Sequence, residues 1–310
     1  HMSILNGRIL QVGSIEKVAP VEKYELDDSF KDLIIMPGLV EGHSHLFEGT
    51  LWNKLYCGYF DRQKPDGSIQ KGTKNVTELI SNLKHAEDKI EDSKTALSGW
   101  GLDPIYFSDK NLDRLILDKV SEKRPIGILH ASGHKLNVNS LGLKLAGFLR
   151  TGINHDGLPL GKDGIPTGEI RGAETIALVT KHVGLGKDWL SGDAEGLRNF
   201  GKICVRAGVT TATDLANLQT DEAVEMMLKV TSEADFPARI VSFRYMQGIN
   251  PKELIPKVLE LKKKSTENLR LGSIKIVADG SIQGFTARLK WPGYYNGAPN
   301  GMWYTAPEHI

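Results

Sequence analysis

Residues 209–243 read VTTATDLANLQTDEAVEMMLKVTSEADFPARIVSF and predict one strand–helix–strand unit. Val209–Thr213 is rich in β-branched residues, which favours a buried strand. From Asp221 the apolar residues recur at the spacing of one helical face, so we expect a helix there. Ala238–Phe243 is apolar again and predicts the next strand.

The same alternation continues on both sides of this unit. Apolar residues from Leu190 to Cys204 lie near one helical face, and Gly208 stands where that helix should end. Pro251 opens another predicted helix, and Leu269–Ala278 predicts another strand. Strands and helices that alternate with short connections indicate a parallel α/β sheet, either a closed barrel or an open doubly wound sheet. No Gly-x-Gly-x-x-Gly motif follows an early strand, which weighs against a dinucleotide-dependent oxidoreductase.

The rest of the chain is less regular. Residues 3–36 predict short strands in a small β unit, because Asn6-Gly7 is a hairpin-turn signal and the apolar run Leu33–Met36 is stopped by a Pro-Gly pair. A helix is predicted from Val76, with Asn75 or Thr77 as its cap. Pro125–Gly172 is rich in glycine and turns, so we expect a long loop region that lines a site or forms an exposed insertion.

Composition limits the possible partners and the compartment. The 310 residues carry a net charge of +1, which argues against nucleic acid and membrane surfaces as partners. We expect a small-molecule substrate because of the polar residues of the glycine-rich region that are described below. No apolar run approaches the ~20 residues of a membrane helix. Cys57 and Cys204 are far apart and read as small buried residues without a disulfide, so we expect a reducing, cytoplasmic location.

Two histidines stand at the end of a predicted strand. His43 and His45 follow the apolar stretch from Met36 to Gly42, and their spacing of two places both imidazoles on one side. Neutral imidazole is a common zinc ligand, so this context favours a metal-binding pair over packed or exposed histidines.

Lys275 and Asp279 mark the end of the last predicted strand. Lys275 lies within an apolar run, where an amine is either an edge residue that reaches water or a neutral group that reacts with carbon dioxide to give a carbamate, an oxygen ligand for metals. Asp279 precedes Gly280 and either forms a turn or faces a pocket, since sites assemble at the carboxyl ends of parallel strands. Asp214 ends its strand similarly, and a structural cap is the better interpretation there.

The glycine-rich region also carries polar residues that could shape a substrate pocket. His134, Asn139, Glu169 and Arg171 each have a simpler structural interpretation when taken alone. As a group we predict that they contact substrate, together with Asp279.

Taken together, these segments resemble the amidohydrolase superfamily, and most closely its family 3 branch, which includes N-substituted formamide deformylases. The motifs that carry the resemblance are MPGLVEGHSH (36–45), SGH (132–134), NVNS (137–140), Gly168-Glu169, GVTTATD (208–214), KIVADGS (275–281) and Thr286-Ala287.

The resemblance implies a (β/α)8 TIM-like barrel and a small β-sandwich that is built from both ends of the chain. Residues 3–36 would form part of the sandwich, 37–49 the first barrel strand and metal motif, 50–185 an insertion over the barrel mouth, and 186–310 βα units. It implies that His43, His45 and a carbamylated Lys275 bind one or two divalent metal ions, zinc above all. Members of the family supply two more histidines and a proton-transferring aspartate from later strands. We therefore expect only the first half of a barrel here, completed by missing sequence, by a second chain or in a homo-oligomer.

The predicted function is metal-dependent hydrolysis of a C–N bond, in an amide, a cyclic amide or a similar compound, by a metal-activated water. The alternative is a non-catalytic or regulatory binding protein that keeps the fold without a complete metal centre.

Overall fold

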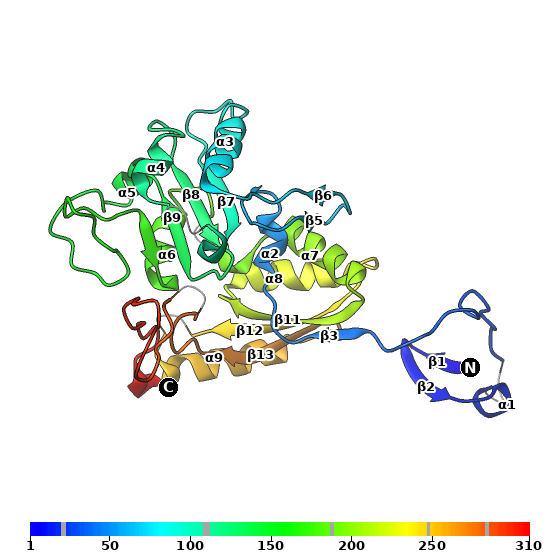
Figure 1. Ribbon diagram of the computed structural model, residues 1–310. Helices are drawn as coiled ribbons and strands as arrows, with labels where there is room; N and C mark the ends of the chain where they lie inside the picture. The colour runs from blue at the N-terminus through cyan, green and yellow to red at the C-terminus, as the bar shows by residue number, and fades with distance from the viewer. Residues whose placement is uncertain (20–22, 108–111, 187–188, 247–248, 283–284) are drawn as a thin grey trace. The chain divides into compact units, whose positions relative to one another are not determined.

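The computed structural model divides into two units, His1–Gly38 and Leu39–Ile310. It describes residues 1–19, 23–107, 112–186, 189–246, 249–282 and 285–310. Figure 1 shows the helices and strands of these residues.

The first unit contains the predicted hairpin but less β structure than expected. Strand β1 (Met2–Leu5) pairs antiparallel with β2 (Arg8–Val12), and α1 (Ile15–Val18) follows. The turn has positive φ at both Asn6 (50°) and Gly7 (72°), which confirms the hairpin signal. In the described part of this unit, Leu33–Met36 belongs to no strand, so the prediction of strands throughout 3–36 was wrong. The hairpin is the only sheet in the described part of this unit, and the sandwich of which it would be a part stays a prediction.

The second unit contains a four-stranded parallel sheet, in the order β13-β12-β11-β3. Helix α8 links β11 to β12 and helix α9 links β12 to β13, as the sequence pattern predicted. The bounds are β3 (Leu39–Glu41), α7 (Ala194–Arg206), β11 (Val209–Asn217), α8 (Asp221–Thr231), β12 (Arg239–Tyr245), α9 (Pro251–Lys263) and β13 (Leu269–Lys275). Figure 1 shows β11, β12 and β13 side by side with their helices.

This sheet is open among the described residues. A closed (β/α)8 barrel requires eight strands whose first and last members pair. Here β3 and β13 are the two edges of a four-stranded sheet. The structure therefore establishes an α/β fold with parallel strands, but it does not confirm the predicted barrel, and it does not support the description of this chain as the first half of one.

A second sheet of five strands lies within residues 55–171, in the order β10-β9-β8-β7-β4. Strands β4, β7 and β8 run parallel, and β9 and β10 continue the sheet antiparallel. The bounds are β4 (Leu55–Tyr56), β7 (Leu97–Leu102), β8 (Ile126–His130), β9 (Lys135–Val138) and β10 (Glu169–Arg171). Smaller elements in and around this region are α2 (Phe47–Leu51), β5 (Arg62–Gln63), β6 (Ile69–Gln70), α3 (Val76–Glu87), the 3-10 turn Pro104–Tyr106, α4 (Arg114–Asp118), α5 (Ser140–Leu145), α6 (Ala173–Thr180) and the 3-10 turn Trp189–Ser191.

The expectation of a long loop over Pro125–Gly172 was thus wrong. The segment contributes β8, β9, α5 and β10. Every residue of β8 and β9 is buried, so burial does not alternate along either strand as it does along a half-exposed one. The predicted helix from Val76 does form, and the Asn75 side chain caps it by accepting a hydrogen bond from the Glu78 N–H.

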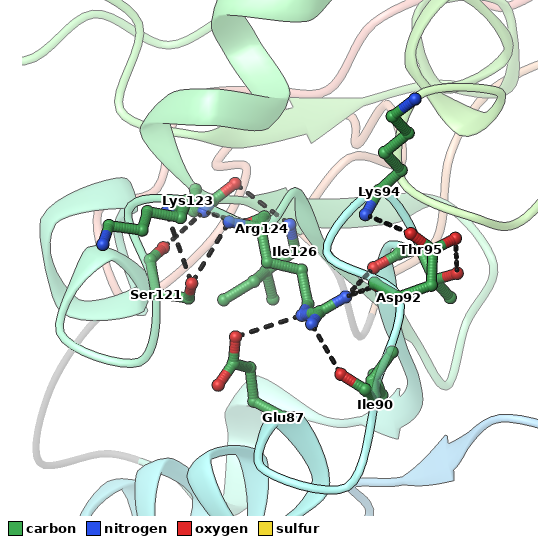
Figure 2. Close-up of polar contacts among 10 residues, drawn as sticks. Glu87, Ile90, Asp92, Lys94, Thr95, Ser121, Lys123, Arg124 and Ile126 are labelled. Atoms are coloured by element: carbon green, nitrogen blue, oxygen red, sulfur yellow. Dashed lines mark hydrogen bonds and ion pairs between the residues drawn. The ribbon is translucent and has the colours of Figure 1, made fainter.

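Arg124 holds the loops beside the five-stranded sheet together (Figure 2). Its buried guanidinium forms an ion pair with Glu87 (3.1 Å) and donates to the carbonyl oxygens of Ile90 (2.9 Å), Asp92 (2.7 Å) and Thr95. A planar guanidinium can satisfy several acceptors at once, whereas a lysine ammonium cannot match this geometry. Arg124 is therefore a structural anchor for the segment that leads into β7.

Two glycines allow helices α2 and α7 to touch. A Cβ on Gly49 would lie 1.9 Å from the Gly196 carbonyl oxygen, and a Cβ on Gly196 would lie 1.9 Å from Thr50 Oγ1. Only glycine permits such an approach of two backbones. The contact matters because α2 begins directly after the predicted metal motif.

Both cysteines are buried and free, as predicted. Burial raises the pKa of the Cys57 thiol to about 12, which keeps it protonated at neutral pH. Among the described residues, no helix combines the length and the apolar character needed to span a membrane.

Candidate active site

A cavity of about 710 Å³ lies within the second unit. Both sheets contribute to its lining, which includes His43, His45 and Lys275 around the four-stranded sheet and Trp100 and His130 on the five-stranded sheet. Because residues far apart in the sequence meet here, the cavity is the candidate active site.

The two histidines after β3 face the cavity as their spacing predicted. Their ring centroids lie 5.5 Å apart with an interplanar angle of 75°. Ser44 between them turns the other way, and its buried hydroxyl donates to the carbonyl oxygen of Thr213 on β11. The backbone alternation thus gives both imidazoles to the cavity and the serine to the sheet.

Asp214 fixes the loop that carries His43 and His45. Its side chain is fully buried and accepts hydrogen bonds from the Leu46 N–H (3.2 Å), the Asn217 amide (2.8 Å) and the Ser242 hydroxyl (3.3 Å). Burial raises the pKa of this carboxyl to about 6. These contacts confirm the structural role predicted for Asp214, and that role is to position the histidine loop.

His45 is neutral at pH 7. Burial, reinforced by the nearby charges of His43, Lys275 and His134, lowers the pKa of its imidazole to about 4. The ring stacks on Phe47 with a centroid distance of 5.1 Å. Its Nδ1 is buried without a hydrogen-bond partner among the described residues. A neutral, desolvated and unpartnered imidazole nitrogen is the chemistry of a metal ligand.

Lys275 is the last residue of β13 and is half-buried. In the described part of the chain no carboxylate pairs with its amine. Its positive charge lies close enough to lower the pKa of both His45 and His134. The structure therefore brings Lys275 to the histidine pair, across more than two hundred residues of sequence.

His134 and Asp279 also line the cavity, as the sequence predicted for substrate contacts. Burial and the charge of Lys275 lower the pKa of His134, while the charge of Asp279 opposes that shift. The His134 ring lies 5.6 Å from the ring of Tyr304. Asp279 also accepts a hydrogen bond from the Arg288 N–H at 2.8 Å and pairs with Trp303 in an isolated β-bridge, so the predicted turn is not what the structure shows here.

The donor set fits a divalent cation in part. His43, His45 and Lys275 converge on one cavity, and the orphaned His45 Nδ1 lacks the partner that a cation would supply. Within the described ranges, no group of three or more histidine, cysteine, aspartate or glutamate side chains is arranged to hold a metal ion. Among the described residues of the cavity, Lys275 is therefore our candidate for a third ligand.

Asn139 does not reach the cavity, so its predicted substrate contact needs correction. The residue is fully buried, and it caps α5. Its Oδ1 accepts from the N–H groups of Ile126 (3.0 Å) and Gly142 (2.9 Å), and its Nδ2 donates to the carbonyls of Ser121 and Arg124 (2.9 Å each). All four hydrogen-bonding positions of the amide are used inside the protein.

Glu169 and Arg171 lie on β10 and do not line the cavity. The Glu169 carboxylate pairs with Arg171 Nε at 2.5 Å and with Lys135 Nζ at 3.2 Å. Burial would raise the pKa of Glu169, but Lys135 and Arg171 outweigh it and lower that pKa. These contacts tie β10 to β9 and leave a substrate role for either residue as a prediction only.

The sequence analysis missed several polar residues that line the cavity, among them Glu48 and His130. Glu48 on α2 lines it, and burial raises the pKa of its carboxyl. His130 at the end of β8 is buried and also lines it, with its pKa lowered to about 4 mainly by burial. His130 Nε2 contacts Asn137 Oδ1. The position of His130 at the end of a parallel strand could have pointed to a site role, but the sequence analysis did not recognise β8 as a strand.

Comparison with known proteins now gives the family. A family model described as "Amidohydrolase family" matches residues 31–300. The chain is 27% identical over 333 residues to the Arabidopsis thaliana Protein LONG AFTER FAR-RED 3, covering 100% of this chain and 52% of that protein. It is 26% identical over 314 residues to the putative amidohydrolase YtcJ of Bacillus subtilis, covering 96% of this chain and 54% of that protein. The chain therefore spans about half the length of the curated relatives it matches.

Two solved structures share the fold. An uncharacterized metal-dependent hydrolase from Pyrococcus horikoshii aligns with a TM-score of 0.53 and 17% identity, over 88% of this chain and 49% of that one. An uncharacterized metal-dependent hydrolase from Pyrococcus furiosus aligns with a TM-score of 0.54 and 17% identity, over 99% of this chain and 58% of that one. At this identity the likeness concerns the fold alone.

Proposed function

Because the chain belongs to the amidohydrolase family, as the sequence motifs predicted, we propose that it carries metal-binding residues of a hydrolase that cleaves a C–N bond in an amide, a cyclic amide or a similar compound. The observation that carries the proposal is the meeting of His43, His45 and Lys275 at one cavity, with His45 Nδ1 buried and unpartnered.

The three residues would hold one or two divalent cations, and zinc suits imidazole nitrogen and oxygen ligands best. A bound cation supplies Lewis acidity, which lowers the pKa of water and polarises a carbonyl group. His43 and His45 each offer an imidazole nitrogen. Lys275 offers its amine or, after reaction with carbon dioxide, a carbamate oxygen.

The other cavity residues would handle the substrate. His134 carries a lowered pKa and is therefore a neutral donor or acceptor for a carbonyl or amide group. Asp279, on the same wall, could accept a hydrogen bond from an amide N–H. Substrate contacts from Glu169 and Arg171 would require a ligand that extends beyond the cavity.

The test measures bound metal and amine release on the same protein. The chain is loaded with zinc, dialysed and analysed by mass spectrometry, and amine release from simple amides is followed with a fluorogenic reagent. We expect bound zinc that is lost in His45→Ala and retained in His85→Ala, because His85 is an exposed histidine on α3 away from the cavity. Zinc binding that is equal in the two variants would contradict the assignment.

The second candidate is a non-catalytic binding protein with this fold. It is favoured by the absence, among the described residues, of a metal-binding group made from three histidine, cysteine or carboxylate side chains. A stable chain that binds amides without zinc and without amine release would support it. A cytoplasmic location and association with a second chain are further proposals that rest on the sequence alone.

A further inference from the structure

Four aromatic side chains line the cavity, and three of them, Tyr59, Phe60 and Tyr106, contact one another. Tyr59, Phe60, Trp100 and Tyr106, here called the aromatic wall, all line the cavity that holds the candidate metal ligands. The Tyr59 and Tyr106 rings stack at 5.0 Å, and Phe60 meets Tyr106 edge-to-face at 5.0 Å. Aromatic pairs with these geometries attract one another and make a rigid apolar surface.

The wall is built on a chain segment that is held in place. The Tyr56 hydroxyl donates to the Phe60 carbonyl oxygen at 2.9 Å, and the Thr73 N–H donates to the Gly58 carbonyl oxygen at 2.7 Å. A Cβ on Gly72 would lie 2.1 Å from the Tyr59 carbonyl oxygen, so only glycine lets the backbone at position 72 pack this closely against the backbone of Tyr59. The rings are therefore pre-positioned before any ligand arrives, which lowers the entropic cost of binding.

Two members of the wall leave apolar surface uncovered. Phe60 is 55% exposed and Tyr106 is 42% exposed, although both stand at the cavity. Trp100 is nearly buried and is fixed by edge-to-face contacts with Trp52 (5.0 Å) and Tyr56 (5.1 Å). Exposure of apolar ring surface to water is unfavourable, so a flat apolar group that covers these rings would be stabilised.

The charges near the wall are already engaged with its rings. The Arg62 guanidinium lies 5.9 Å from the Trp100 ring centroid, and Lys74 Nζ lies 4.4 Å from that of Tyr59. These cations sit against aromatic faces, as in cation–π pairs. The exposed part of the wall thus offers ring surface to an aromatic group of a ligand.

We propose that the aromatic wall binds the aromatic substituent of an amide-type substrate, while the amide itself lies toward His43, His45 and Lys275. This inference rests on the proposed hydrolase function for the identity of the reacting group, but the ring preference does not depend on hydrolysis. Phe60 and Tyr106 are then the specificity-determining residues, because they present the open ring surface.

The experiment compares two amides that differ only in ring type. Acetanilide carries a flat aromatic ring and N-cyclohexylacetamide carries a saturated ring on the same amide. Both are titrated by NMR into the full chain without added metal, so that affinity is measured apart from turnover. We expect acetanilide to bind about tenfold more tightly, the effect of one or two good ring contacts.

Variants then assign the preference to the wall. Phe60→Ala and Tyr106→Ala should each reduce acetanilide affinity by about fivefold and bring the ratio between the two amides toward one. Phe30→Ala is the matched control, since Phe30 is 52% exposed but belongs to the first unit. Because Phe60 and Phe30 are similarly exposed, neither change should prevent folding. Equal affinity for the two amides, or equal effects of Phe60→Ala and Phe30→Ala, would overturn the proposal.

The outcome is separable from that of the hydrolase proposal. A Phe60-dependent preference for acetanilide without zinc binding or amine release would keep the aromatic wall and reject the hydrolase. Zinc-dependent amine release from both amides at equal rates, with no ring preference in binding, would keep the hydrolase and reject the wall.

Discussion

Replacing Asn139 tests whether this residue contacts substrate, as its sequence context suggested, or stabilises the fold through buried hydrogen bonds, as the structure shows. Asn139→Ala removes four buried hydrogen bonds, to Ser121, Arg124, Ile126 and Gly142. Each such bond contributes about 1 kcal/mol net, so the sum is about 4 kcal/mol of unfolding free energy. That is a large fraction of the roughly 5–15 kcal/mol that stabilises a typical domain.

The assay is urea unfolding followed by tryptophan fluorescence, with Asn250→Ala as the control. Asn250 caps α9 at an exposed position and accepts one hydrogen bond from the Lys252 N–H, so its loss should cost about 1 kcal/mol. Asn139→Asp keeps the accepting oxygen but turns a second oxygen toward two carbonyls, and it should be at least as destabilising as Asn139→Ala. A folded Asn139→Ala protein with wild-type stability and weakened amide binding would refute this reasoning.

Three further changes probe the scaffold around the cavity. Gly196→Ala should lower the unfolding free energy by about 1–3 kcal/mol despite the better helix propensity of alanine, because the new Cβ would strike Thr50, and thermal unfolding measures this loss. Arg124→Lys should cost about 2–4 kcal/mol in urea unfolding, since an ammonium cannot replace the guanidinium among its acceptors, whereas Arg198→Lys in an exposed ion pair should cost less than about 1 kcal/mol. Burial raises the pKa of Asp214 to about 6, so this carboxyl stabilises the folded state at low pH and loses that contribution as the pH rises through about 6. Asp214→Asn should remove this pH dependence. The unfolding free energy of the wild type relative to the variant should therefore fall by up to about 3 kcal/mol between pH 4 and pH 7.

The regular part of the fold could be predicted because its strands and helices differ in period. The helical spacing of α8 and the β-branched run of β11 were both visible, and Asn6-Gly7 marked its hairpin turn. The five-stranded sheet was not predicted, because its strands are short, β7, β8 and β9 are buried along their whole length, and glycines interrupt β7 and β8. Gly101, with a φ of 89°, lies inside β7, and glycine within a strand reads as a turn in the sequence.

The residues of the candidate site were likewise predictable only in part. His43, His45 and Lys275 lie on or directly after strands that were recognised, although the last of these strands ends at Lys275 and not at Ala278 as predicted. Their meeting at one cavity was implied by the resemblance to the amidohydrolase superfamily. Asn139 and Glu169 were assigned from a region taken to be a loop, and a polar residue in a loop reads as available to ligands. In the structure the region contains strands and a helix, Asn139 caps that helix, and Glu169 forms an ion pair with Lys135.

The two ends of the cavity are held by separate sets of contacts, and this separation has a consequence for the proposed chemistry. Ser44 and Asp214 fasten the histidine loop to β11, whereas the Tyr56 hydroxyl and Gly72 fasten the segment that carries Phe60. The two sets share no residue, and mutations at sites without shared partners have nearly additive effects. Ring preference at the aromatic wall can therefore change while the geometry of the candidate metal ligands is retained. Under the proposed function, such an arrangement would let one hydrolytic centre serve different amide substituents through changes confined to the five-stranded sheet and the segment beside it.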